Sequence, residues 1–378
     1  MKSNYKMLGE YIRQVDVRNT EGKEDNLLGV SVQKQFIPSI ANTVGTDFKK
    51  YKVVKKGQFT YIPDTSRRGD KIAIALLQDY DEGLVSNVYT VFEVIDTEKL
   101  LPEYLMLWFS RPEFDRYARF KSHGSVREVM DWDEMCKVEL PVPSIEEQRR
   151  IVKAYKTITD RIALKKQIND NLEAQGASLF HLLFDDQTVL SQGTISCFGE
   201  VIGGATPSKD MAEYFCSDGI VWLTPKDLTA TGNKFIYKGE MDITETAYRS
   251  CSTKLMPKGS VLLTSRAPVG TVAIAMTELC TNQGFKSIVP NDDFGTEFVY
   301  YFLKENKQLL ESHSSGTTFM EISGNVLKEI PVVYPAKNKV KKFNVLCKPI
   351  FSYQESIQKE IRRLQDLQQT IISKLSSR

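Results

Sequence analysis

The chain has 378 residues, which is long for one hydrophobic core and fits two domains of roughly 150 residues with a connecting segment. Hydrophobic residues make up 41% of it and its net charge is only +2, which indicates a globular protein and excludes one that grips nucleic acid through overall positive charge. No apolar run approaches the roughly 20 residues of a membrane helix, and the N-terminus lacks the apolar core of a secretory signal, so we expect a cytoplasmic protein that does not enter a membrane.

The first predicted unit covers residues 1–143 and begins with strands. The stretch "VVKKGQFTYI" (53–62) places a Lys-Gly turn before an apolar, β-rich run, and "KIAIALL" (71–77) continues with a second apolar segment. A helix is predicted next, because "PEYLMLWFSRPEF" (102–114) carries apolar residues at i, i+3 and i+4 spacing. A glycine-containing loop, "SHGS" (122–125), follows it, so the unit is expected to be α+β with a small mixed sheet.

Residues 144–189 differ from everything before them, because their apolar residues recur at steps of three and four. The pattern predicts one helix of up to ~40 residues, which would be ~60 Å long at ~1.5 Å per residue. The residues expected to pack along it are Ile151, Tyr155, Ile158, Ile162 and Leu172. A long helix cannot bury such a stripe by itself, so it needs a partner helix.

The next unit, residues 190–337, repeats the first with small insertions. The segment "GDKIAIA" (69–75) is matched by "VGTVAIA" (269–275), and "EYLMLWF" (103–109) is matched by "EFVYYFL" (297–303). The later segments "SHGS" (122–125) and "ELPVP" (139–143) are matched by "SHSS" (312–315) and "EIPVVYP" (329–335). The matches keep their order, which indicates a duplicated half-chain rather than a short solenoid repeat.

Residues 338–378 again predict a long helix with one apolar stripe, and its packing residues include Ile357, Ile361, Leu364 and Ile371. Pro349 is expected to kink or delay this helix. The segment also holds the excess positive charge of the chain, with nine Lys and Arg against three Asp and Glu. Because the first long helix leads into the second unit and the other follows it, we expect an antiparallel pair with a similar unit at each end.

Catalytic patterns are missing from the sequence. It contains no GxGxxG, GxxxxGK[ST], HExxH or GxSxG, and none of the Asn-Pro-Pro-aromatic elements of an adenine methyltransferase. The six cysteines form no CxxC pair and the three histidines lie far from them, which argues for free thiols and against a zinc site. Pro63-Asp64 and Asp70-Lys71 lack the acidic-x-Lys element that would complete a nuclease site. We therefore expect no catalytic residues, no metal and no cofactor.

Candidate binding residues lie in the polar loops between the short strands. The loop "YIPDTSRRGDK" (61–71) combines guanidinium, hydroxyl and aromatic groups that suit contact with base edges and phosphates, and "LLTSRAPVGT" (262–271) brings a Ser-Arg pair to the matching place. The full set of candidate DNA contacts is Lys34, Tyr61, Thr65, Ser66, Arg67, Arg68, Lys71, Ser122, Ser125, Thr206, Ser208, Lys209, Lys226, Ser265, Arg266, Ser314, Ser315 and Thr317.

Each of these signals has a plainer interpretation. A polar loop between strands is equally well a solvated hairpin tip, and only its duplication favours function. His123 and His313 are better explained as residues at helix C-termini than as ligands of DNA. The near-neutral charge of both units also fits a tandem adaptor that binds proteins rather than DNA. A DNA-reading assembly would lose affinity steeply with salt, whereas an apolar protein interface would not.

Taken together, these segments resemble a known family. The run "GEVIGGATPSKDMAEYF" (199–215), "GIVWLTPKDL" (219–228) and "KGSVLLTSRAPVGTVAIA" (258–275) resembles a target recognition domain of the specificity subunit of type I restriction-modification systems. The first unit resembles another variant of this domain, through "GVSVQKQFIP" (29–38) and "LPVPSIEEQRRIV" (140–152). It lacks the Thr-Pro-Ser and Trp-x-Thr-Pro elements, so Thr206, Ser208, Lys209 and Lys226 are candidates in the second unit alone.

The resemblance implies a non-catalytic protein that binds double-stranded DNA. The implied domains are recognition domain 1 (1–143), a central spacer helix (144–189), recognition domain 2 (190–337) and a C-terminal spacer helix (338–378). Each recognition domain would read one half of a gapped target, with the helices fixing the separation. Two methyltransferase subunits would dock on this chain and bring the adenine chemistry with S-adenosylmethionine, and restriction subunits could join them.

Overall fold

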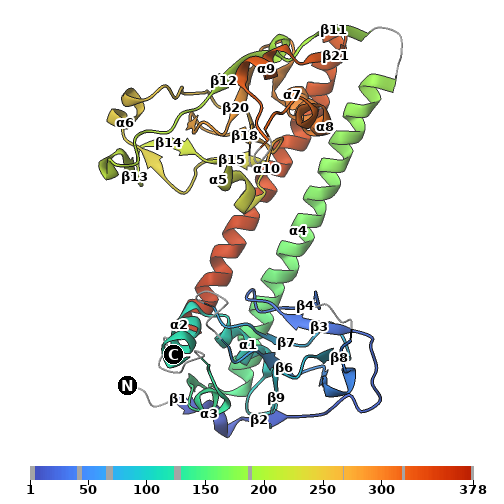
Figure 1. Cartoon of the computed structure of the whole chain (residues 1–378), viewed down its shortest axis with the longest axis vertical. Coiled ribbons are helices and arrows are strands. Elements are labelled where there is room, and N and C mark those ends of the chain that lie inside the picture. Colours follow the sequence, from blue (N-terminus) through green and yellow to red (C-terminus); the bar gives the residue numbers. More distant parts are fainter. Residues whose placement is uncertain are drawn as a thin grey trace. The chain divides into compact units, whose positions relative to one another are not determined.

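The computed structural model describes residues 5–40, 45–64, 71–122, 129–185, 190–266, 268–316 and 320–375 (Figure 1). Its backbone divides into two compact units, of which unit 1 comprises Met1–Ile162 with Arg363–Arg378 and unit 2 comprises Ala163–Arg362. Two long helices, α4 (Ile145–Asp185) and α10 (Lys337–Lys374), contribute residues to both units. Each unit combines sheets with helices, so the predicted α+β class is confirmed.

Unit 1 carries short strands and three helices before α4. The strands are β1 (Tyr5–Met7), β2 (Ile12–Val15), β3 (Leu27–Val30), β4 (Phe36–Pro38), β5 (Lys52–Lys55), β6 (Phe59–Tyr61), β7 (Ile74–Leu76), β8 (Glu82–Val85), β9 (Thr90–Val94) and β10 (Glu139–Pro141). The helices are α1 (Pro102–Phe109), α2 (Pro112–Ser122) and α3 (Trp132–Cys136), with 3-10 turns η1 (Leu8–Glu10) and η2 (Phe48–Lys50).

Unit 2 has the same kinds of element in a similar order. Its strands are β11 (Leu190–Thr194), β12 (Gly199–Gly203), β13 (Phe215–Cys216), β14 (Ile220–Leu223), β15 (Phe235–Ile236), β16 (Asp242–Ile243), β17 (Val261–Leu263), β18 (Val272–Ala275), β19 (Cys280–Thr281), β20 (Lys286–Pro290) and β21 (Pro331–Pro335). Its helices are α5 (Pro225–Thr231), α6 (Glu245–Ser250), α7 (Gly295–Glu305), α8 (Lys307–Ser312) and α9 (Gly324–Glu329), with 3-10 turns η3 (Ile195–Phe198) and η4 (Ala212–Tyr214).

The sheet topologies of the two units correspond. One sheet of unit 1 has the order β2-β9-β6-β7, and unit 2 has β12-β20-β17-β18 with β15 added at the edge. A two-stranded sheet, β1-β10 or β11-β21, pairs the start of each unit with the strand that precedes its long helix. The remaining sheets, β4-β3-β8-β5 and β13-β16-β14-β19, each contain one parallel pair. The duplication seen in the sequence is therefore a duplication of topology in the main and two-stranded sheets, whereas these remaining sheets differ in strand order.

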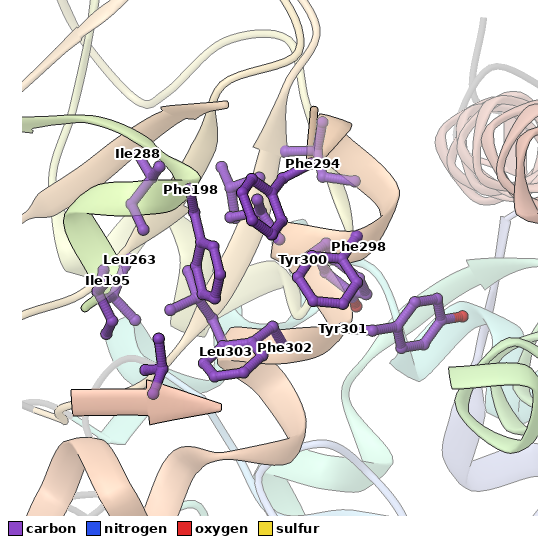
Figure 2. Close-up of a cluster of buried hydrophobic side chains, with 14 of the residues drawn as sticks. Ile195, Phe198, Leu263, Ile288, Phe294, Phe298, Tyr300, Tyr301, Phe302 and Leu303 are labelled. Carbon is purple, nitrogen blue, oxygen red and sulfur yellow. The ribbon is translucent and has the colours of Figure 1, made fainter. Parts of the chain in front are cut away.

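Aromatic side chains fill the main core of each unit. In unit 1 the rings of Phe59 and Phe92, on neighbouring strands, stack with centroids 4.8 Å apart. In unit 2 Phe198 packs against α7, with its ring centroid 5.6 Å from that of Phe298 and 4.7 Å from that of Phe302 (Figure 2). Truncating a ring in such a cluster typically costs about 3–5 kcal/mol, so these cores hold the sheets on their helices.

The long helices run antiparallel within each unit. In unit 1 the Gln368 amide donates to the Thr159 hydroxyl at 2.7 Å. In unit 2 Lys165 pairs with Glu360 at 2.8 Å, while the rings of Phe180 and Phe343 lie 6.0 Å apart. Of the predicted packing residues, Ile162, Ile357 and Leu364 are buried. The others, which are Ile151, Tyr155, Ile158, Leu172, Ile361 and Ile371, are half-buried.

The predicted helix lengths are confirmed, since α4 has 41 residues and α10 has 38. Pro349 lies inside α10 and does not delay it, which corrects that part of the expectation. A proline removes the hydrogen bond to the carbonyl four residues earlier, here that of Val345. Both Pro349 and Val345 are exposed, so water can solvate the free carbonyl. Neither helix, nor any other in the described ranges, is long and apolar enough to cross a membrane.

Candidate nucleic-acid interface

In both units the loop that follows the third strand of the main sheet, β6 in unit 1 and β17 in unit 2, is joined to a later segment. An equivalent backbone hydrogen bond makes the connection in each unit. In unit 1 the Met130 N–H donates to the Pro63 carbonyl at 2.9 Å, next to a bridge between Asp64 and Val129. In unit 2 the Ile322 N–H donates to the Ser265 carbonyl at 3.0 Å, next to a bridge between Arg266 and Glu321. The loops singled out in the sequence are thus paired with the segments that follow "SHGS" and "SHSS".

The strand registers show that these loops differ in length. Tyr61 pairs with Ile74 across β6 and β7, whereas Leu263 pairs with Val272 across β17 and β18. The intervening loop therefore spans 62–73 in unit 1 and 264–271 in unit 2, four residues fewer. By its bridge Arg266 corresponds to Asp64. Ser66 and Arg67, the pair expected to match Ser265 and Arg266, lie outside the described residues.

Arg266 and Lys286 lie around one carboxylate in unit 2. The Arg266 guanidinium is 4.0 Å from Glu321, and about a third of its side chain is exposed. Lys286, at the start of β20, donates only weakly to the carbonyls of Gln283 and Phe285, both at 3.2 Å. Burial lowers the pKa of Lys286, Glu321 opposes this shift, and Arg266 adds to it. Neither cation is held by a close ion pair with Glu321, so both can turn toward a polyanion.

A second loop joins this group through a hydrogen bond between Thr206 and the side chain of Gln283. The loop is anchored by the Ala205 N–H, which donates to the Thr281 carbonyl at 3.0 Å. At Gly204 a Cβ would lie 2.2 Å from that same carbonyl oxygen, so only glycine allows the close approach. Hydrogen bonds link Thr206 to Gln283 and Gln283 to Lys286, while Glu321 contacts both Arg266 and Ser315. The Ser265 N–H, which donates to the Gly284 carbonyl at 2.8 Å, holds the two groups side by side. We call Thr206, Arg266, Gln283, Lys286, Ser315 and Glu321 the unit 2 polar cluster.

Several other predicted contacts lie near this cluster or on the surface. Ser208 and Lys209 are exposed beyond Thr206. Lys226 lies in the first turn of α5, beside Pro225 that borders Gly284, and its ammonium pairs with Glu240 at 2.9 Å. The Ser314 hydroxyl donates to the Glu311 carbonyl at 2.5 Å, and Ser315 exchanges two backbone bonds with Glu321. Lys71 is exposed in unit 1. Thr65, Ser66, Arg67, Arg68, Ser125 and Thr317 lie outside the described residues.

The side chain of Lys34 is buried and makes structural contacts. It adopts a positive φ of 64° in the turn between β3 and β4, and its ammonium lies 2.8 Å from the buried carboxylate of Asp115 on α2. It also donates to the Phe109 carbonyl. Burial lowers the pKa of Lys34, with Asp115 opposing the shift. Because its ammonium has these partners, we leave Lys34 out of the proposed interface.

Three more predicted contacts are buried and are left out for the same reason. Tyr61 is fully buried in β6, edge-on to Phe92. The Ser122 hydroxyl donates to the Ala118 carbonyl at 2.6 Å, inside its own helix. Ser265 is 1% exposed, so its role in the loop is that of a backbone anchor. Successive side chains of a strand point to opposite faces of the sheet, so every second one is buried when one face is covered. A single sequence does not reveal where the strand ends and this alternation stops.

Sequence reasoning missed Gln283, Lys286 and Glu321. The signal available for Lys286 was a lone cation at the head of the apolar run "KSIVP" (286–290). Its side chain packs between two glycines, since Cβ atoms at Gly203 and Gly324 would lie 3.7 Å and 3.6 Å from its Cδ. The interpretation of His313 as a helix C-terminal residue is confirmed, because it caps α8 and its ring nitrogen lies 2.9 Å from the Leu309 carbonyl oxygen.

Two similar α+β units with paired polar loops, joined by long helices, define a class of duplicated binding proteins. Comparison with known protein families identifies this class. The type I restriction modification DNA specificity domain matches residues 2–174 and again 193–376. The chain therefore belongs to the family of type I restriction-modification specificity proteins and carries two copies of its domain.

Individual relatives agree with this assignment. The chain is 46% identical over 150 residues to the type I restriction enzyme MjaIX specificity subunit of Methanocaldococcus jannaschii, a match that covers 39% of this chain and 34% of that protein. It is 22% identical to the HindI specificity subunit of Haemophilus influenzae, over 89% of each chain. Among solved structures, the S subunit from M. genitalium is similar in fold, with a TM-score of 0.59, 15% identity and coverage of 98% of this chain and 95% of that one.

Proposed function

We propose that this chain is the DNA specificity subunit of a type I restriction-modification complex. Recognition domain 1 (1–143) and recognition domain 2 (190–337) each read one half of a gapped double-stranded target. The spacer helices (144–189 and 338–378) set the gap and dock two methyltransferase subunits, and restriction subunits can join the complex. The chain itself contributes recognition and no catalysis.

One observation carries this proposal: the two units present the same loop pairing. The bonds from Met130 to Pro63 and from Ile322 to Ser265 bring together equivalent loops in both. In unit 2 these loops hold Arg266 with Lys286, Thr206 and Gln283 close by. Guanidinium groups suit guanine edges, amides suit adenine edges, and ammonium and hydroxyl groups suit phosphates. A duplicated polar loop system of this kind is suited to reading two short DNA segments.

Electrostatics supports a partner-assisted mode of binding. Unit 2 places cations in one local cluster, while residues 190–337 as a whole carry 13 Lys and Arg against 16 Asp and Glu. Most phosphate contacts must then come from methyltransferase subunits that surround the duplex. Base flipping by those subunits would add a deformation energy to the direct contacts.

A domain exchange tests the proposal. Residues 190–335 are replaced by the equivalent segment of a relative with a known target, and the complex with its methyltransferase is assayed for the sequences it methylates. One half of the target should change while the other half and the gap persist. Change of both halves would refute modular reading. Phosphate contacts weaken as salt rises. If affinity for DNA does not decrease as salt is raised from about 50 to 200 mM, the protein adaptor is favoured instead.

A further inference from the structure

The five-stranded sheet of unit 2, β12-β20-β17-β18-β15, is called the recognition sheet below. Its edge strand β15 is joined to the long helices by polar side chains. Among the strands that the structure describes, β15 pairs with β18 alone, so its outer edge presents backbone groups that no strand covers. The Phe235 N–H donates to the Gln358 side-chain carbonyl at 3.1 Å, and the Gln358 amide donates to the Phe235 carbonyl at 2.6 Å. A side chain of α10 thus completes the ladder that a further strand would have made.

A buried ion pair lies beside this contact. The Lys234 ammonium is 2.8 Å from Glu173 of α4 and donates at 2.8 Å to the side-chain carbonyl of Gln354 of α10. Gln354 is 1% exposed and returns a bond to Glu173 at 3.0 Å. We call Glu173, Lys234, Phe235, Gln354 and Gln358 the docking seam. It joins the recognition sheet to both long helices inside unit 2.

Aromatic rings line the Lys234 side of the seam. The Lys234 ammonium lies 3.5 Å from the ring centroid of Phe351 and 4.3 Å from that of Tyr300. Tyr301 reaches the margin of the apolar cluster and turns its hydroxyl outward, 3.4 Å from the Glu173 carbonyl (Figure 2). Hydrogen bonds and charges in such surroundings are strong when paired and costly when broken.

We infer that the docking seam fixes the pose of recognition domain 2 on the spacer helices and so makes the complex selective for one gap length. This inference rests on the proposed function. Apolar packing is non-directional, so an apolar contact alone would allow the sheet to shift by a small distance along the helices. The Gln358 amide matches both backbone groups of one residue, and consecutive residues of a strand turn those groups to opposite sides. A slip of one residue would break both bonds.

The length of such a slip explains why it would matter. One strand residue advances about 3.3 Å, and one base pair advances about 3.4 Å along the duplex. A recognition domain that could shift by one register would therefore accept targets whose gaps differ by about one base pair. Glu173, Lys234 and Gln358 act as positioning residues, because their polar groups are bonded to one another and to the edge strand inside unit 2.

Two variants separate positioning from simple stability. The double variant Lys234→Met with Glu173→Gln removes both charges of this pair at nearly constant volume, a change that is often neutral or stabilising for a buried pair. Lys304, the second partner of Glu173, is 40% exposed and can be solvated in the variant. Gln358→Leu keeps the size of the side chain and removes both bonds to Phe235. The matched control is Arg249→Met with Glu245→Gln, an exposed pair of α6 at 2.9 Å with side chains that are 77% and 60% exposed.

The test uses the full chain co-purified with its methyltransferase subunits and a duplex library that holds both wild-type half-sites while the gap varies by two base pairs either way. In wild type and control, one gap should dominate. In the seam variants the ratio of the best gap to its neighbours should fall by about tenfold, as expected for one or two lost hydrogen bonds, with base preferences inside the half-sites retained.

The outcomes are distinguishable. A gap ratio within about twofold of wild type in both seam variants overturns the inference, and so does loss of base preference in one half-site at an unchanged gap ratio. If Gln358→Leu fails to fold, Tyr237→Phe gives the same readout, because it removes only the hydroxyl bond from the residue after β15 to Glu355 of α10. A wild-type complex that selects no split target refutes the proposed function itself.

Discussion

Gln148 and Asn344 make equivalent contacts in the two units. The Gln148 side chain accepts the Leu101 N–H at 2.9 Å and donates to the Lys99 carbonyl at 2.9 Å, which ties the start of α1 to α4. The Asn344 side chain accepts the Phe298 N–H at 3.0 Å and donates to the Phe294 carbonyl at 2.6 Å, which ties the start of α7 to α10. In each unit one amide on the long helix satisfies backbone groups at the N-terminus of a shorter helix, α1 in unit 1 and α7 in unit 2.

Replacing Gln148 by Ala should therefore destabilise unit 1. Gln148 is fully buried, so its loss leaves the Leu101 N–H and the Lys99 carbonyl unsatisfied, at a cost of about 1–3 kcal/mol. Urea unfolding followed by circular dichroism measures the change. Gln167→Ala, at an exposed position of the same helix, should alter stability by no more than about 0.5 kcal/mol. If the two variants lose the same unfolding free energy, Gln148 does not have the capping role assigned to it.

Replacing Arg266 by Ala should relax one base position in the half-site read by unit 2, or weaken binding, by about 1–3 kcal/mol if the guanidinium contacts a base edge. Competition binding with single-base variants of the target measures it. The control is Arg249→Ala, which removes an exposed arginine already paired with Glu245. If the Arg266 variant binds like this control at every base position of the target, Arg266 is a solvated residue at a hairpin tip and does not contact a base.

The Glu173 carboxylate should make stability depend on pH on the acid side. Burial opposes its ionisation, but Lys234 and Lys304 outweigh burial and lower the pKa of Glu173 to about 2 from 4.5. Because the pKa of Glu173 is lower in the folded state, its ionised carboxylate stabilises the fold at pH values above the unfolded-state pKa of about 4.5. This stabilisation is lost as pH falls from about 4.5 toward 2. The stability advantage of wild type over Glu173→Gln should shrink as pH drops from 5 to about 3. A constant difference across that range would contradict the assignment.

Lengthening both spacer helices should lengthen the gap in the target. Seven residues inserted after Ile158 in α4, and seven after the opposing Gln368 in α10, keep the contact between Thr159 and Gln368 in register. Seven helical residues rise about 10 Å, which corresponds to about three base pairs. Sequencing of the methylated sites reports the gap. An unchanged gap with both helices extended would argue against a spacer role.

The sequence predicted the parts of the fold that depend on periodicity. Apolar steps of three and four residues located α4 and α10, and repeated short strands predicted a small sheet in each unit, where the residues that the structure describes form three. Contacts between distant residues were not predictable in this way. Lys34 meets Asp115, which lies 81 positions later in the chain, and that pairing converts an apparent DNA contact into a buried structural group. Burial of Tyr61 depends likewise on Phe92 across the sheet.

The candidate site was predicted in outline only. The loops at 264–271 and 314–322 were singled out from their hydroxyl and guanidinium groups, and their pairing brings Arg266 next to Glu321. Lys286 escaped notice because it starts an apolar strand, and its place in the cluster depends on the glycines that flank it in space. Side chains that reach a site from another strand leave no local signal in a single sequence.

The most direct test of the central claim is selection of bound duplexes from a randomised library, with this chain co-purified with the methyltransferase of its host. Two domains that each read half a target predict recovery of a split motif, with two short specified segments separated by a gap of fixed length. Recovery of no motif from a complex that holds its partner firmly would contradict sequence-specific recognition and favour the tandem protein adaptor.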